Sequence, residues 1–239
     1  MFSTDPAAPQ TLSFSRFEAG GVEIHDGRAV FALAPGGLLR LESFRAGGLG
    51  GSLDLAPIAL DLARPSADIR AKVSGLDSAR LAAYLPAAVS EAHGRLSGDI
   101  AFHWDPRAGL DFGGGHLSLQ KTEPASLRLA PAPGFFTARV PAQIALLGGP
   151  LRRFLTIRNP AYDTLGKIEL GEMPLAVESI EAGFDPGGDG QGRTARIAIV
   201  ARPTASGGGV KIVRFNINIY GPLDKTIRFG LDDRINFSW

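Results

Sequence analysis

The chain contains no cysteine, so a disulfide framework, a thiolate zinc site and a cysteine nucleophile are all excluded. Charge of one sign is not in excess either: 25 Lys and Arg stand against 24 Asp and Glu, and neither sign forms a long run. This balance disfavours nucleic acid as a partner. With two Trp and three Tyr, the inventory for stacking on sugars is thin, which disfavours a carbohydrate-binding enzyme.

Long apolar runs are also missing. No uninterrupted stretch approaches the ~20 residues that cross a bilayer as a helix. The N-terminus, MFSTDPAAPQTLSF, lacks a basic segment followed by an apolar one. We therefore expect that the chain as printed neither exports nor anchors itself.

Alternation of apolar and polar residues dominates what is present, and it predicts strands with one apolar face. It is clearest around Leu12 to Phe14, Ile69 to Val73, Ile100 to Trp104, Val213 to Ile219 and Ile227 to Leu231. Gly (31) and Pro (17) recur at short intervals, as turns between antiparallel strands require. The turn signals include Asp26-Gly27, Pro35-Gly36-Gly37, Gly113-Gly114-Gly115 and Gly207-Gly208-Gly209. A mainly β, antiparallel fold follows.

Helix signals are few. Residues 77–85 form the best one, since Asp77 or Ser78 can cap a first turn and Leu81 with Leu85 supplies an apolar stripe. A second candidate starts at Pro141 and resumes at residues 151–155 after a Gly-Gly-Pro break. Residues 185–192 are rich in Gly and Asp, which predicts a mobile loop.

No set of residues predicts catalysis, a metal site or a cofactor. The four histidines show no ligand spacing, and Gly113-Gly114-Gly115 is followed by neither a helix pattern nor a Lys-Ser or Lys-Thr pair. Ser90 lies near Glu91 and His93 but in no nucleophile motif, so a loop at a helix end is favoured. One basic concentration could meet lipid phosphate or an acidic partner, although a solvated face is favoured: Arg152, Arg153, Arg158 and Lys167.

One ordered series of segments is more specific. It consists of FEAGGVEIHDGRAVFAL at 17–33, LLRLESFRAGGLGGSL at 38–53, VSGLDSARLAAYL at 73–85, GRLSGDI at 94–100 and LDFGGGHL at 110–117. This series resembles the C-terminal part of YdbH-type proteins, an AsmA-like family of intermembrane phospholipid transport once labelled a dicarboxylate transport domain. The resemblance is good over residues 17–130, and beyond them the segments agree with the family only in their general character. It departs from the family pattern at Ala101, where Pro is usual, and in lacking the family's long N-terminal strand repeats.

The resemblance implies a twisted open sheet, or groove, with one or two short helices, and no enzyme activity. It also implies phospholipid acyl chains as ligand and a small outer-membrane lipoprotein as partner near the C-terminal end. The place implied is the periplasm, within a protein anchored in the inner membrane. We expect that the signal or anchor lay upstream of Met1.

Three segments follow: an N-terminal tail or entering strand at 1–16, a groove segment at 17–130 with a helix near 77–85, and a C-terminal β segment at 131–239. The last would hold short helices near 141–165 and the loop at 185–192. Candidate groove residues are Ile100, Phe102, Val213, Phe215, Ile217, Ile219, Ile227 and Phe229. An apolar stripe needs a cover, which the sequence does not name. A closed β-sandwich with a structural or adhesive role is therefore the alternative.

Overall fold

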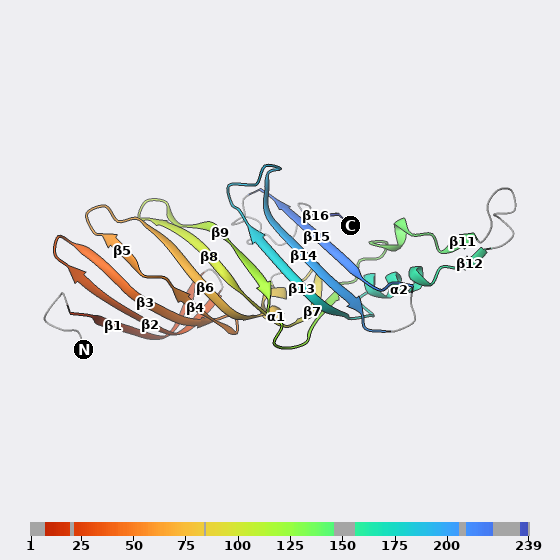
Figure 1. Ribbon diagram of the computed structural model, residues 1–239, viewed down its shortest axis with the longest axis horizontal. Coiled ribbons are helices and arrows are strands. Elements are labelled where there is room, and N and C mark those ends of the chain that lie inside the picture. Colours follow the sequence, from red (N-terminus) through yellow and green to blue (C-terminus); the bar gives the residue numbers. More distant parts are fainter. Residues whose placement is uncertain are drawn as a thin grey trace.

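The computed structural model describes residues 8–19, 22–83, 85–145, 156–205, 209–221 and 235–238. Most of them form strands of one antiparallel sheet, which contains 14 strands among the described residues (Figure 1). The sheet is open, because its main path begins at one strand and ends at another without closing: β1-β2-β3-β4-β6-β8-β9-β13-β14-β15-β16. The predicted mainly β, open antiparallel fold with two short helices is confirmed.

The first part of the path is a meander. Its strands are β1 (Gln10–Ala19), β2 (Val22–Ala34), β3 (Leu38–Gly48), β4 (Gly51–Leu55), β5 (Ile58–Asp61), β6 (Ala67–Asp77), β8 (Arg95–Asp105) and β9 (Gly109–Leu119). β4 and β5 both pair with β3, and β6 pairs with β4 and β8. Pro35, Gly36 and Gly37 make the turn between β2 and β3, as predicted.

The second part holds β13 (Leu175–Phe184), β14 (Arg193–Pro203), β15 (Val213–Tyr220) and β16 (Ile235–Ser238). The sheet branches at β13. Residues 181–184 of β13 pair with β9, whereas residues 175–177 pair with β10 (Ala125–Leu129), which in turn pairs with β7 (Val89–His93). This branch carries β7 and β10 out of the main path, next to α1 (Ser78–Ala82).

Two helices and one 3-10 turn complete the described chain. Asp77 caps α1 by accepting a hydrogen bond from the Ala79 amide, as the sequence predicts. The helix predicted from Pro141 is wrong, since β11 (Gln143–Ala145) lies there and pairs with β12 (Thr156–Arg158). The helix of this region is α2 (Pro160–Glu169), which follows the 3-10 turn η1 (Thr137–Arg139) in the chain. Residues 151–155 lie outside the described residues.

Two glycine signals that predict turns lie inside strands instead. Asp26-Gly27 is within β2, where Asp26 adopts a φ of 52° at a register shift, so the pair makes a bulge. Gly113, Gly114 and Gly115 lie within β9, beside a register shift between β8 and β9. Gly207-Gly208-Gly209 falls partly outside the described residues.

Residues 185–192 form a turn closed by its own hydrogen bonds. The Asp189 carboxylate accepts from the Gln191 and Arg193 amides at 2.9 and 3.0 Å. These backbone hydrogen bonds, with those from the Arg193 side chain, lower the pKa of Asp189. The predicted mobility of this loop stays a prediction, but its geometry is specified by one carboxylate.

Candidate functional site

The two faces of the sheet differ in chemistry along its length. Register places residues of like polarity opposite one another on successive strands along three long rows of the ladder, two of them apolar and one polar. One row that runs from β1 to β15 contains only apolar residues and one glycine: Leu12, Ala29, Phe44, Leu55, Ala71, Ile100, Gly115, Phe184, Ala195 and Ile219. A parallel row on the same face contains Ala46, Leu53, Val73, Gly98, Leu117, Ala182, Ile197 and Ile217.

The opposite face is polar and internally ion-paired. The row between the two apolar rows contains Arg28, Arg45, Asp54, Lys72, Asp99, His116, Gly183, Arg196 and Asn218. Arg45 pairs with Asp54, and His116 Nε2 lies 2.9 Å from a Glu181 carboxylate oxygen. His103 Nδ1 lies 2.8 Å from Asp68 on the same face. These histidines are therefore engaged in surface pairs, and the described residues contain no group of three or more possible metal ligands.

The apolar face has no cover over β1 to β3 among the described residues. The only hydrophobic residues buried on β1 to β3 are alanines. The larger apolar side chains there keep part of their surface exposed: Phe14, Phe31, Leu41 and Phe44 are half-buried and Leu12 and Leu33 are exposed. None of the three buried clusters that the described residues form includes a side chain from these strands. No second sheet faces them within the described part of the chain, so a closed sandwich is not what this structure forms.

Aromatic rings mark both ends of the open face. The Phe14 ring lies 6.3 Å from those of Phe17 and Phe44. Farther along, Phe112 stands between Phe102 and Phe184, with ring centroids 5.7 and 5.9 Å apart. The Phe14–Phe44 pair is tilted, with an interplanar angle of 34°, and the other three pairs meet edge to face, an arrangement that stabilises neighbouring rings.

Glycines bring β8 and β9 close together beneath this surface. A Cβ on Gly98 would lie 1.9 Å from the His116 carbonyl oxygen, and one on Gly115 would lie 2.4 Å from that of Asp99. Any side chain at either position would force the two backbones apart. This close approach of the two backbones explains why Gly98 in GRLSGDI and Gly115 in LDFGGGHL are glycines.

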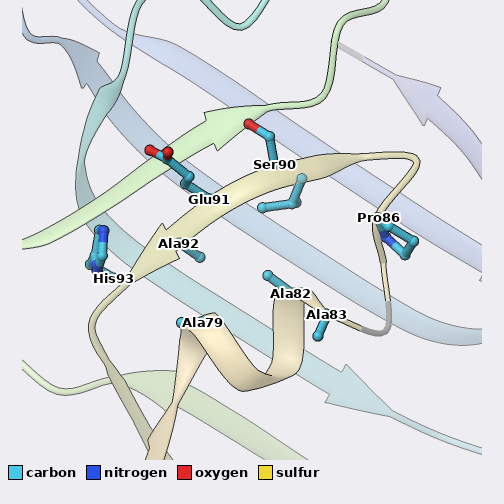
Figure 2. A pocket seen from close by; sticks show the side chains of 9 residues that line it. Ala79, Ala82, Ala83, Pro86, Ser90, Glu91, Ala92 and His93 are labelled. Atoms are coloured by element: carbon cyan, nitrogen blue, oxygen red, sulfur yellow. The ribbon is translucent and has the colours of Figure 1, made fainter.

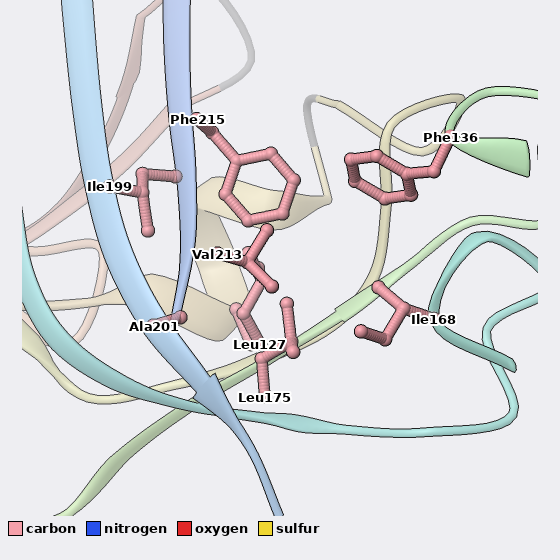
Figure 3. Close-up of a cluster of buried hydrophobic side chains, with 9 residues drawn as sticks. Leu127, Phe136, Ile168, Leu175, Ile199, Ala201, Val213 and Phe215 are labelled. Carbon is pink, nitrogen blue, oxygen red and sulfur yellow. The ribbon is translucent and has the colours of Figure 1, made fainter. Parts of the chain in front are cut away.

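The apolar face is covered over part of β14 and β15. Figure 3 shows Phe136, Ile168 and Leu127 packed over Val213, Phe215, Ile199 and Ala201. Phe136 comes from the segment before η1, Ile168 from α2 and Leu127 from β10, and the ring centroids of Phe136 and Phe215 are 6.0 Å apart. Ile168 and Leu175 of this cluster are fully buried.

A buried carboxylate fixes this cover. Glu169, 4% exposed, accepts hydrogen bonds from the Phe136 and Thr137 amides at 2.8 and 3.0 Å and from the Thr137 hydroxyl at 2.6 Å. Burial disfavours ionisation of Glu169, but the hydrogen bonds from Thr137 and Phe136 outweigh it and hold its pKa below the ordinary value. The ionised side chain therefore ties η1 to the end of α2.

The predicted groove residues fall into three groups. Ile100, Phe102 and Ile217 are half-buried on the apolar face, and Ile219 is buried beside Ala195 with Phe112, Phe184 and Ile217 packed around them. Val213 and Phe215 lie in the covered cluster, 6% and 5% exposed. Ile227 and Phe229 lie outside the described residues. Contact of any of these residues with lipid stays a prediction.

Several residues of the apolar face were missed from sequence. Phe44 and Phe184 each sit in an alternating stretch and could have been found by that signal. Phe112 could not, because Gly113-Gly114-Gly115 interrupts the alternation directly after it.

A hollow of about 440 Å³ lies between α1 and β7 (Figure 2). Its wall is mostly short aliphatic side chains, among them Ala79, Ala82 and Val89. Ser90 on its edge donates its hydroxyl to the Leu129 carbonyl at 3.0 Å, and Glu91 pairs with Arg128 at 3.1 Å. Ser90 thus makes a structural contact and has no general base beside its hydroxyl in these contacts.

The fold is an open antiparallel sheet with one ion-paired face and one apolar face, and the described residues leave the apolar face uncovered over β1 to β3. The model of the YdbH-like family, described as intermembrane phospholipid transport protein YdbH, matches residues 3–140 of the 239. The chain belongs to this family, which is a lipid transport family of the cell envelope and not an enzyme family. Searches of curated proteins and of solved structures found no match. No helix among the described residues is long and apolar enough to cross a membrane.

Proposed function

We propose that the chain is a non-catalytic groove module that binds and conducts phospholipid between the inner and outer membranes of a bacterial envelope. The observation that carries the proposal is the apolar row from Leu12 to Ile219, which the described residues leave uncovered over β1 to β3. Membership of a phospholipid transport family supports the choice of ligand.

The mechanism is partitioning. An acyl chain laid across the open face removes its own surface and that of Phe44, Phe102 and their neighbours from water, at about 0.8 kcal/mol per buried CH₂. Because the apolar rows cross successive strands without a polar interruption, a chain can move from one strand to the next without passing a charged group. No bond is made or broken.

The periplasm is the place that fits such a module, since its family transports phospholipid between membranes. A small outer-membrane lipoprotein remains the partner that the family resemblance implies near the C-terminal end. β16 is the last strand on the described path, and no described strand pairs with its outer edge. A strand of such a partner has a backbone edge to meet there.

The test is lipid content on one strand with two faces. Phe102→Asp places a charge on the open apolar face, while Ala101→Asp places the same charge on the opposite face of β8, across from Arg70. Native mass spectrometry of the purified full chain should show bound phospholipid in the wild type and in Ala101→Asp, and several-fold less in Phe102→Asp. Absence of phospholipid from the wild type, or equal retention by both variants, would overturn the proposal.

A further inference from the structure

The two-stranded sheet of β11 and β12 stands apart from the body of the molecule. Its strands pair only with each other among the described residues, and Figure 1 shows them beyond α2, at the end of the molecule far from the N-terminus. Ile144 and Ile157 face each other across the pair, yet they are 41% and 46% exposed. An isolated pair of strands is marginally stable in water, so this exposed apolar pair lacks the support that the main sheet gives its own side chains.

Positive charge is concentrated in the part of the sequence that contains β11 and β12. Residues 139–168 contain five Arg or Lys and one Asp. The whole chain contains 25 Arg or Lys and 24 Asp or Glu, so the rest of the chain has a net negative charge. Arg158 ends β12 with its side chain 79% exposed, and Lys167 is exposed on α2. The one acidic residue of the region, Asp163, is paired with Arg158 at 2.7 Å.

We propose that β11 and β12 dock on the surface of a phospholipid bilayer that carries anionic headgroups. Ile144 and Ile157 enter the interface between headgroups and acyl chains, and Arg158 and Lys167 meet lipid phosphates. The inference does not rest on the proposed groove, because these strands contribute no residue to it.

Two observations favour a bilayer over a protein partner. A pair of isoleucines is too small for the buried core of a stable protein interface, but it suffices for an interfacial anchor when basic side chains accompany it. The charge contrast between this region and the rest of the chain also orients the molecule, since an anionic surface attracts this end and repels the remainder.

The full chain should be tested by flotation with vesicles of phosphatidylcholine, with and without phosphatidylglycerol. We expect binding to increase with phosphatidylglycerol and to decrease with added salt. The double variant Ile144→Ser and Ile157→Ser should bind about tenfold less, because two apolar anchors are lost. The control Leu62→Ser removes a side chain of similar exposure, 49%, from the turn after β5 and should bind as the wild type does.

The double variant should melt as the wild type does, because Ile144 and Ile157 are exposed and belong to none of the three buried clusters of the described residues. Its phospholipid content by native mass spectrometry should also be unchanged, which separates this proposal from the groove. Wild-type binding by the double variant, an equal loss in Leu62→Ser, or binding that ignores phosphatidylglycerol would overturn docking through these strands.

Discussion

Phe215 and Ile217 lie two residues apart on one strand and one face, but only Phe215 is closed in. Phe215 is 5% exposed under Phe136, within the cluster tied by Glu169. Phe215→Asp should lose roughly 3 to 5 kcal/mol from truncation of a buried aromatic side chain. It also buries a carboxylate without a partner, which adds several kcal/mol more. A domain of ordinary stability does not survive that sum.

Ile217→Asp should behave differently. Ile217 is half-buried and contacts the smaller cluster with Phe112 and Phe184 at the end of the open face. About half of an isoleucine's burial is lost, or roughly 1 to 1.5 kcal/mol, and water can reach the new carboxylate. For a chain of this length, such a loss lowers the melting temperature by roughly 2 to 6 °C. Bound phospholipid should fall sharply, because the apolar row is interrupted by a charge.

Thermal melts and lipid mass spectrometry on both variants give a clear decision. If Ile217→Asp unfolds as Phe215→Asp does, the face at Ile217 is a closed core and the groove does not extend to β15. If Ile217→Asp melts near the wild type and keeps its lipid, Ile217 faces solvent and the assignment of the two faces is wrong.

Three further predictions follow from single contacts. The pKa of Glu169 in the folded protein lies below its unfolded value of about 4.3. Its contribution to stability is therefore present at neutral pH and is lost as the pH falls through the folded pKa. The melting temperature of the wild type should fall more steeply on acidification than that of Glu169→Gln. Gly98→Ala should cost roughly 2 to 4 kcal/mol in urea unfolding, because its Cβ would meet the His116 carbonyl, whereas Gly183→Ala, with nothing within 4 Å, should cost less than about 1 kcal/mol; equal costs would contradict the close approach. Asp189→Ala should speed hydrogen exchange at the Gln191 and Arg193 amides, and unchanged rates would show that the turn does not depend on this carboxylate.

The strands were predictable because one periodicity accounts for them. Alternation marks β1, β6, β8 and β15, and the Asp77 cap marks α1. Asn159 followed by Pro160 is also a signal for the start of α2, but the apolar spacing from Pro141 predicts a helix that begins earlier in the chain. At β11 the strand forms by pairing with β12, a contact from thirteen residues away that local spacing does not show.

The cover over the apolar face could not be predicted. Val213 and Phe215 alternate with polar residues in the same way as Ile100 and Phe102, yet the first pair lies under Phe136 and the second lies on the open side. The branch at β13 decides the difference, because it brings β10, η1 and α2 over Val213 and Phe215 but not over Phe102. Such a branch depends on pairing between distant segments, and alternation within a strand carries no information about it.

The boundary of the family match runs through the covered cluster, because Leu127 and Phe136 lie inside the matched residues and Ile168, Val213 and Phe215 lie outside them. The matched residues, 3–140, contain the open strands, α1 and the branch with β7 and β10, and they end just after η1. The remainder supplies α2 and β13 to β16, which close the cluster around Phe215. The covered part buries Ile168 and Leu175 fully, whereas the only hydrophobic residues buried on β1 to β3 are alanines, so we expect β1 to β3 to be the less stable part of the sheet. β1 to β3 are joined to the rest of the sheet by backbone pairing, and their larger apolar side chains contribute to none of the buried clusters, which is the arrangement that the proposed lipid binding requires.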